Sequence, residues 1–328
     1  MRGEARSGQS VVLERQRENI EDLLGDDIGG LQKELDVTDI ICNPPLPGED
    51  FCRIWVSRIG RDREPVARMS PERAVRLIGS VAASMGKEAT EDTPSVEGFL
   101  ITNGARFQGL VYPSVNGGFF AIRKHASAVF PYSQYVDERK MTSRQVDVIE
   151  RAIDDRLNII IAGGTGSGKT TLLNATILSM TTISPHHRFF IIEDNPELKC
   201  SAPDRTMTTT SHSMSIRDLV KAAMRSFADR IIVGETRGPE MLDILDVWNT
   251  GHEGGAATIH SNTAHPKYAL KRIEHLLLKA NLRYMQPVIA ETVNLVICIE
   301  SSRGHRRVNQ VASVQGWDGH DYQITQEA

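Results

Sequence analysis

The chain has 328 residues, of which 40% are hydrophobic and 24% charged, and a formal net charge of -4 at pH 7. This length suits about two domains of roughly 150 residues each, and the composition is that of an ordinary globular protein. The charge balance gives no support for nucleic-acid binding by a general positive field. The four cysteines show no CxxC spacing and are interpreted as reduced thiols or core residues. We expect no Sec-type signal peptide, because the start of the sequence has no apolar core, and no membrane span, because no apolar run approaches ~18 residues.

Residues 1–137 predict an α+β domain. A charged helical pattern covers residues 11–24, and strand patterns begin at Asp39 and cover residues 51–59. Ser70 followed by Pro71 predicts a helix start, with serine as the N-cap and proline in the first turn. Further strands are expected at 106–111 and 119–123, and the polar segment 132–142 is the expected linker.

Residues 138–328 predict an α/β domain. Apolar runs without polar alternation cover 158–162, 188–192, 230–233 and 256–259, as expected for strands buried on both faces of a parallel sheet. Helical patterns lie between most of these runs, at 172–180, 216–227 and 241–249. Strands that alternate with helices indicate a parallel α/β sheet. Strand and turn signals return from about residue 293.

A phosphate-binding loop follows the first of these strands. Its residues are Gly163, Gly164, Thr165, Gly166, Ser167, Gly168, Lys169 and Thr170, with Thr171 next, and they fit G-x-x-x-x-G-K-[ST]. Glycines let backbone N–H groups converge on phosphate oxygens, and the N-terminus of the following helix favours negative charge. The lysine can reach the β- and γ-phosphates, and the hydroxyl of Thr170 can bind Mg²⁺. The sequence therefore predicts an ATP site with Mg²⁺.

Polar residues end three other predicted strands: Glu193, Glu235 and His260. Because the carboxyl ends of parallel strands share one edge of a sheet, these side chains should lie near the phosphates. A carboxylate there can orient water or help to hold Mg²⁺, Glu235 being the metal candidate, although acids are also favoured at helix starts.

Three arginines could stabilise charge on a transferred phosphoryl group: Arg237, which follows Glu235 closely, and Arg106 and Arg123 in the first domain. On composition alone, the interpretation of each as a solvated surface arginine is favoured.

The segment GHEGGAATIH, residues 251–260, could be a metal site, a phosphate site or a turn. Its two histidines do not have a standard zinc spacing, and no HExxH or CxxC motif supports a metal. We expect a glycine-rich turn with a structural or interface role for His252, whereas His260 ends the following strand at the edge near the phosphate-binding loop.

Four stretches in this order, GGTGSGKTT, IIEDNPEL, DRIIVGETRG and GHEGGAATIHSN, resemble the Walker A, Asp box, Walker B and His box of the type II and type IV secretion (traffic) ATPases. NGARFQGLVYPS and FFAIRKH, and the lack of a four-cysteine zinc motif, favour the type IV branch. The resemblance implies a RecA-like P-loop NTPase domain preceded by a smaller α+β domain that covers the nucleotide and makes ring contacts.

The resemblance also implies individual roles. Glu193 is expected to position the attacking water and Glu235 to act near Mg²⁺ and the water, although either could be the general base. His260 senses the γ-phosphate or links subunits, and Arg106 and Arg123 reach over the phosphates.

Family members are hexameric rings on the cytoplasmic face of the inner membrane, where they act with other type IV secretion ATPases and inner-membrane components. The expected function is ATP hydrolysis that drives pilus assembly or DNA transfer in conjugation. Two alternatives stay open. A motor that pulls DNA directly would need basic loops, such as the turn RGHRR at residues 303–307. A nucleotide-sensing scaffold without turnover would not need both glutamates.

Overall fold

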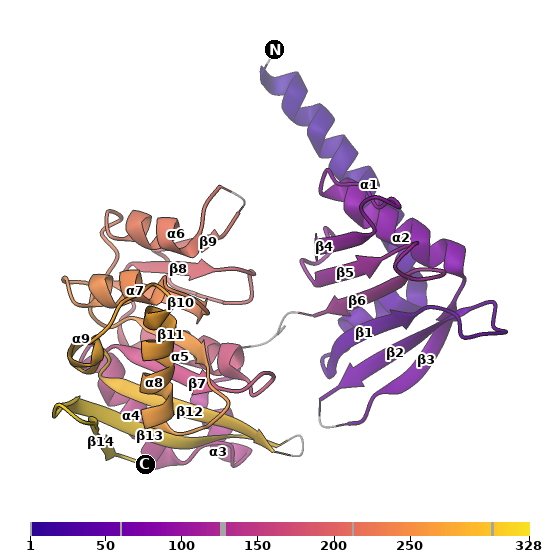
Figure 1. Ribbon diagram of the computed structural model, residues 1–328. Helices are drawn as coiled ribbons and strands as arrows, with labels where there is room; N and C mark the ends of the chain where they lie inside the picture. The colour runs from indigo at the N-terminus through magenta and orange to yellow at the C-terminus, as the bar shows by residue number, and fades with distance from the viewer. Residues whose placement is uncertain (1, 60, 125–128, 212, 303–304) are drawn as a thin grey trace. The chain divides into compact units, whose positions relative to one another are not determined.

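The computed structural model describes residues 2–59, 61–124, 129–211, 213–302 and 305–328, and the side chains from residue 11 onward (Figure 1). The chain forms two compact units, Met1–Ser127 and Ala128–Ala328. The division lies earlier than the expected boundary after residue 137. The segment predicted as a linker instead contains helix α3 (Tyr132–Asp137), and Tyr132 and Tyr135 are buried in the core of the second unit.

The first unit has an antiparallel sheet in the order β3-β2-β1-β6-β5-β4 within the described residues. Its strands are β1 (Val37–Asn43), β2 (Cys52–Arg58), β3 (Glu64–Met69), β4 (Ser95–Phe99), β5 (Arg106–Leu110) and β6 (Phe119–Arg123). Helices α1 (Arg2–Lys33) and α2 (Pro71–Ser84) share the hydrophobic core of the sheet. The hydroxyl of Ser70 accepts the N–H of Arg73 at 3.2 Å, so the predicted N-cap is confirmed.

The second unit has a mixed sheet in the order β14-β13-β12-β7-β11-β10-β8-β9 within the described residues. Its strands are β7 (Ile159–Gly163), β8 (Phe189–Glu193), β9 (Arg205–Thr209), β10 (Arg230–Thr236), β11 (Ala256–His260), β12 (Leu295–Ser302), β13 (His305–Trp317) and β14 (Tyr322–Gln326). The strands from β12 to β9 run parallel, and β13 and β14 are antiparallel. The four predicted buried strands are β7, β8, β10 and β11.

Besides α3, the helices of this unit are α4 (Ser143–Asp154), α5 (Lys169–Ile183), α6 (Ile216–Ala223), α7 (Met241–Trp248), α8 (Pro266–Leu278) and α9 (Gln286–Thr292). The helix expected at 216–227 is shorter at its end: α6 stops at Ala223, and Phe227 has a left-handed φ of 57°. Ser215 is the N-cap of α6, where Ser215 and Asp218 form a capping box. The edge strand β9 was not predicted, since four of its five residues, RTMTT, are polar, and its positions alternate only between exposed and half-buried.

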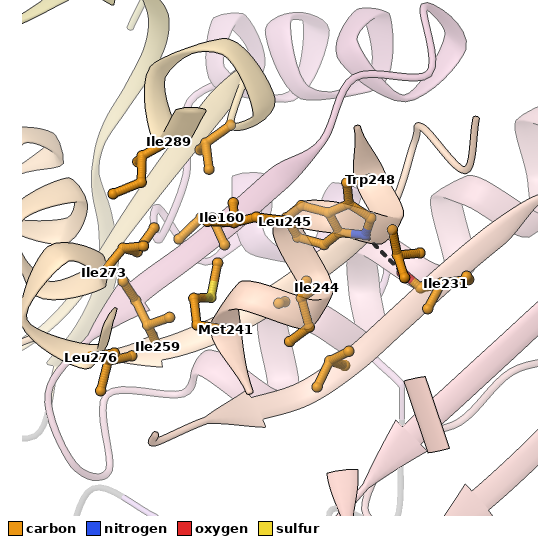
Figure 2. Packing of buried hydrophobic residues seen from close by; sticks show 14 of the residues in the cluster. Ile160, Ile231, Met241, Ile244, Leu245, Trp248, Ile259, Ile273, Leu276 and Ile289 are labelled. Atoms are coloured by element: carbon orange, nitrogen blue, oxygen red, sulfur yellow. Dashed lines mark hydrogen bonds between the residues drawn. The ribbon is translucent and has the colours of Figure 1, made fainter. Parts of the chain in front are cut away.

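The core around the central strands fixes the ends of those strands in place. Figure 2 shows Trp248 of α7 packed among isoleucines, where its indole N–H donates to the carbonyl of Ile231 at 3.4 Å. Every residue of β7 is buried, and Ile160 and Ile161 contribute to the cores on opposite faces of the sheet. Burial of one such side chain stabilises the fold by about 1.5–3 kcal/mol. The loop that follows β7 therefore starts from a rigid support.

Candidate active site

The phosphate-binding loop joins β7 to α5, as the sequence predicts. At Gly163 there is no room for a side chain, because a Cβ atom would lie 2.4 Å from the carbonyl oxygen of Ile299. Gly168, the N-cap of α5, has a φ of 98°, a left-handed conformation that glycine adopts without strain. The Ser167 hydroxyl is buried and lacks a hydrogen-bond partner among the described residues. A tight loop with an unsatisfied hydroxyl, placed at a helix N-terminus, suits a phosphate ligand.

Lys169 lies in the first turn of α5 and is 9% exposed. Its ammonium donates to the carbonyl oxygen of Gly164 at 2.9 Å, across the loop. Burial lowers the pKa of Lys169, and the nearby charge of Glu235 raises it in part. A buried ammonium at a helix N-terminus is stabilised by an anion. Thr170 and Thr171 are half-buried in the same turn, where a hydroxyl could bind a metal that also contacts phosphate.

The three polar strand ends lie at the carboxyl edge of the sheet, in the order β7, β11, β10, β8. His260 ends β11 directly opposite Gly163 of β7. Its Nε2 lies 2.8 Å from the Asn262 side-chain oxygen. Strand β10 is longer than predicted and carries Glu235 near its end, and Glu193 ends β8. The backbone of His260 therefore lies beside the phosphate-binding loop. The backbone of Glu193 lies three strand spacings from β7, or roughly 14 Å.

Glu193 is 4% exposed and held by its own loop. Its Oε2 accepts the backbone N–H groups of Glu197 at 2.9 Å and Leu198 at 2.8 Å. Burial raises the pKa of Glu193 to about 7, although these two hydrogen bonds lower it in part. A carboxyl group with a pKa near neutral pH is suited to accept a proton from water.

Asn174 of α5 forms two hydrogen bonds to the loop that follows Glu193, a role that the sequence does not predict. Its amide donates to the Glu197 carbonyl at 3.1 Å and accepts the Lys199 N–H at 2.7 Å. The side chain is 1% exposed. The helix that begins with Lys169 is thereby connected to the loop that holds Glu193. Its position five residues after the lysine gives no signal for this contact, which depends on tertiary structure.

Glu235 and Arg237 form an ion pair, with the Arg237 Nε 2.9 Å from Oε2 of Glu235. This hydrogen bond raises the pKa of Arg237. The turn after β10 is fixed by Glu240, whose Oε1 accepts the N–H groups of Arg237 and Gly238, both at 2.8 Å. The structure thus brings together Glu235, the carboxylate predicted to help hold Mg²⁺, and Arg237, one of the three predicted arginines.

Arg106 and Arg123 belong to the first unit and lie directly opposite each other in the β5–β6 pairing. Adjacent like charges on a sheet repel each other unless they are compensated. Arg106 pairs with Glu97 at 2.8 Å and Arg123 with Asp39 at 2.8 Å. The two predicted arginines therefore lie side by side on this unit, and a carboxylate compensates the charge of each.

The basic turn at 303–307 is only partly described, since Arg303 and Gly304 lie outside the described residues. Arg307 pairs with Glu300 at 2.7 Å. Arg306 lies beside the phosphate-binding loop, because a Cβ atom on Gly168 would be 3.4 Å from its Cδ. The sequence showed a basic turn here but not its position next to the nucleotide site.

His252 lies at the other end of β11, away from the phosphate-binding loop. Its Nδ1 is 3.0 Å from the Ala228 carbonyl, a contact that secures the glycine-rich turn. Among the residues that the structure describes, no group of three or more His, Cys, Asp or Glu side chains could hold a metal ion. The Thr170 hydroxyl and the Glu235 carboxylate are oxygen groups at this edge of the sheet that suit a Mg²⁺ ion.

A parallel sheet with a phosphate-binding loop and acidic ends on neighbouring strands defines a P-loop nucleotide-binding protein of the RecA-like type. Residues 102–314 match the model of the family "Type II/IV secretion system protein", and the chain belongs to this family of secretion ATPases. The expected fold, a RecA-like domain preceded by a smaller N-terminal domain, is confirmed.

Within the family, the chain resembles the conjugal transfer protein TrbB of Rhizobium radiobacter, with 41% identity over 304 residues that cover 93% of this chain and 92% of that protein. It is 39% identical over 305 residues to the probable conjugal transfer protein TrbB of Sinorhizobium fredii (strain NBRC 101917 / NGR234), covering 93% of this chain and 91% of that protein. The X-ray structure of the Legionella pneumophila ATPase DotB shares the fold, with a TM-score of 0.59, 20% identity, and coverage of 90% of this chain and 79% of that one.

Proposed function

We propose that this chain hydrolyses Mg-ATP at the loop 163–170 and that it does so as a hexameric ring. The observation that carries the proposal is the buried ammonium of Lys169 in a glycine loop, on the same sheet edge as the buried carboxyl of Glu193. Catalysis of phosphoryl transfer consists mostly of positioning and charge stabilisation, and this edge supplies groups for both.

Each residue has a proposed role in this reaction. Lys169 binds the β- and γ-phosphates, and the Thr170 hydroxyl and Glu235 face the metal, Glu235 through water. Mg²⁺ would neutralise charge on the phosphate oxygens as it develops. Glu193 accepts the proton of the attacking water, because its pKa of about 7 leaves a basic form available at neutral pH. Arg237 orients Glu235 through their ion pair.

His260 is proposed to report the γ-phosphate, since it lies on the strand next to β7. Arg106 and Arg123, which lie opposite each other in the β5–β6 pairing, are proposed to bind the phosphates from the N-terminal unit, which also supplies ring contacts. Contacts that exist only when nucleotide is bound would let hydrolysis change the arrangement of the subunits.

The proposed process is conjugative type IV secretion, by pilus assembly, DNA transfer or both. It rests on the two relatives named for conjugal transfer. The proposed location is the cytoplasmic face of the inner membrane, beside other secretion ATPases and inner-membrane components. None of the described helices is long and apolar enough to cross a membrane.

The test of hydrolysis is phosphate release from Mg-ATP by the full chain and by Lys169→Ala. We expect Lys169→Ala to lose nearly all turnover, because the variant lacks the ammonium that lies across the loop, 2.9 Å from the Gly164 carbonyl oxygen. Lys221→Ala, which removes an exposed lysine from α6, is the matched control and should keep wild-type turnover. Equal phosphate release by wild type and Lys169→Ala would refute the proposal.

A further inference from the structure

The side chain of Arg306 packs against the last glycine of the phosphate-binding loop. Arg306 and Arg307 are neighbours at the start of β13, so their side chains point to opposite faces of the strand. Arg307 points to Glu300 and is 64% exposed. On the other face, a Cβ atom on Gly168 would lie 3.4 Å from Arg306 Cδ and 3.5 Å from Ile299 Cδ1. The stem of Arg306 thus lies along the point where α5 begins.

The charge of Arg306 has no protein partner in the described part of the chain, either as a hydrogen bond or as an ion pair. The side chain is half-buried. The charge of Arg306 also acts on Tyr135 of α3: burial raises the pKa of this phenol, and the charge of Arg306 lowers it in part. Half-buried guanidinium groups are normally paired, because partial loss of hydration weakens the charged form. A phosphate oxygen would complete the hydrogen bonds of this group.

We propose that Arg306 binds the α- and β-phosphates of the nucleotide held by the loop 163–170. Gly168 and Lys169 open the helix, and the backbone amides at this end of a P-loop are those that hold the α- and β-phosphates. A guanidinium offers two parallel N–H donors to one phosphate, a geometry that an ammonium lacks. The inference rests on the proposed function only in that the ligand is a nucleotide. It also gives the basic turn a role other than DNA binding.

The test is ADP affinity, measured by calorimetry on the full chain. Arg306→Gln keeps the Cδ carbon that packs on Gly168 and removes the charge. We expect this variant to bind ADP about 10- to 100-fold more weakly, the usual loss for a charge-assisted hydrogen bond. Arg307→Ala removes the neighbouring arginine, which points the other way, and should bind ADP within about twofold of wild type. Affinity of Arg306→Gln equal to that of Arg307→Ala would overturn the proposal.

Pyrophosphate, used as a competitor of bound ADP, separates a phosphate contact from a contact with the base or ribose. We expect Arg306→Gln to weaken pyrophosphate as well as ADP. A loss for ADP alone would overturn the assignment to phosphate. If Arg306→Gln does not fold, Arg306→Lys is measured instead. Lysine keeps the charge but not the two parallel N–H donors of arginine, so about 3- to 10-fold weaker ADP binding supports a paired contact. Unchanged ADP affinity of Arg306→Lys overturns it.

The binding readout keeps this inference separate from hydrolysis. If the wild type binds ADP, and Arg306→Gln binds it weakly, but no phosphate release depends on Lys169, then the hydrolase proposal fails and the Arg306 contact stands. If phosphate release depends on Lys169 and Arg306→Gln binds ADP normally, the hydrolase proposal stands and the Arg306 contact fails.

Discussion

Glu193→Gln is expected to stabilise the fold while it abolishes hydrolysis. The carboxyl group is 4% exposed, and burial raises its pKa to about 7 from the ordinary 4.5. A difference of this size means that the ionised form is about 3 kcal/mol less favourable in the folded chain than in the unfolded chain. Glutamine is neutral at every pH, and its amide oxygen can accept the same two backbone N–H groups from Glu197 and Leu198.

The raised pKa of Glu193 determines how the stability of the fold changes with pH. Below pH 4.5 the carboxyl is protonated in both states, so its ionisation does not affect stability. Between pH 4.5 and 7 the unfolded chain releases the proton and the folded chain keeps it, so the stability of the wild type falls as pH rises. Above pH 7 the full cost of about 3 kcal/mol is present. Glu193→Gln avoids this cost, and its advantage over wild type should grow from near zero at pH 4 to between about 1 and 3 kcal/mol at pH 8.

The assay is urea denaturation at several pH values, followed by the fluorescence of tryptophans such as Trp248 in the core of the second unit. Glu197→Gln makes the same chemical change at a half-buried position of the same loop and serves as the control. In parallel, wild-type kcat/KM should rise with pH through about 7, as the carboxylate form appears, and Glu193→Gln should lose turnover. A variant that is less stable than wild type at pH 8 would refute the reasoning, because the carboxyl would then not be desolvated.

Two further comparisons separate functional from structural residues. His260→Ala should slow hydrolysis at least tenfold with nucleotide affinity nearly unchanged. His252→Ala should instead cost about 1 kcal/mol of stability and leave the turnover of the folded protein intact. If phosphate-release and unfolding assays gave the reverse pattern, the functional role of His260 and the structural role of His252 would both be rejected. Asn174→Ala should speed hydrogen exchange in the segment 195–199 and move the rise of kcat/KM to higher pH, because the Glu193 carboxylate loses the amides that lower its pKa. Ser179→Ala, another buried polar deletion in α5, should do neither, and equal exchange in both variants would contradict the prediction.

The sequence predicts the site best where the local chain determines it. The loop 163–170 has its own glycine pattern, and its flanking strand and helix follow from apolar runs. The strand-end residues Glu193, Glu235 and His260 required one further premise, that the strands are parallel, and the pairing of β7, β11, β10 and β8 meets it. Topology alone then brings these ends to one edge.

What the sequence does not reveal depends on contacts between distant segments. Arg306 reaches Gly168 only because β12 pairs with β7 and carries the hairpin to the loop. Tyr132 looked like part of a polar linker, but its hydroxyl donates to Thr176 at 2.9 Å in the core, so the second unit begins earlier than its composition suggests. The adjacency of Arg106 and Arg123 likewise needs the strand register, which a hydrophobic pattern does not specify.

The central claim, hydrolysis at the loop 163–170 by subunits that act together in a ring, is tested most directly by mixing subunits. Wild-type and Lys169→Ala chains are combined in varied ratios at constant total concentration, and phosphate release is measured after assembly. We predict that phosphate release falls more steeply than the wild-type fraction, because one inactive subunit impairs its neighbours. A decline strictly proportional to the wild-type fraction, or release that does not depend on Lys169, would contradict it.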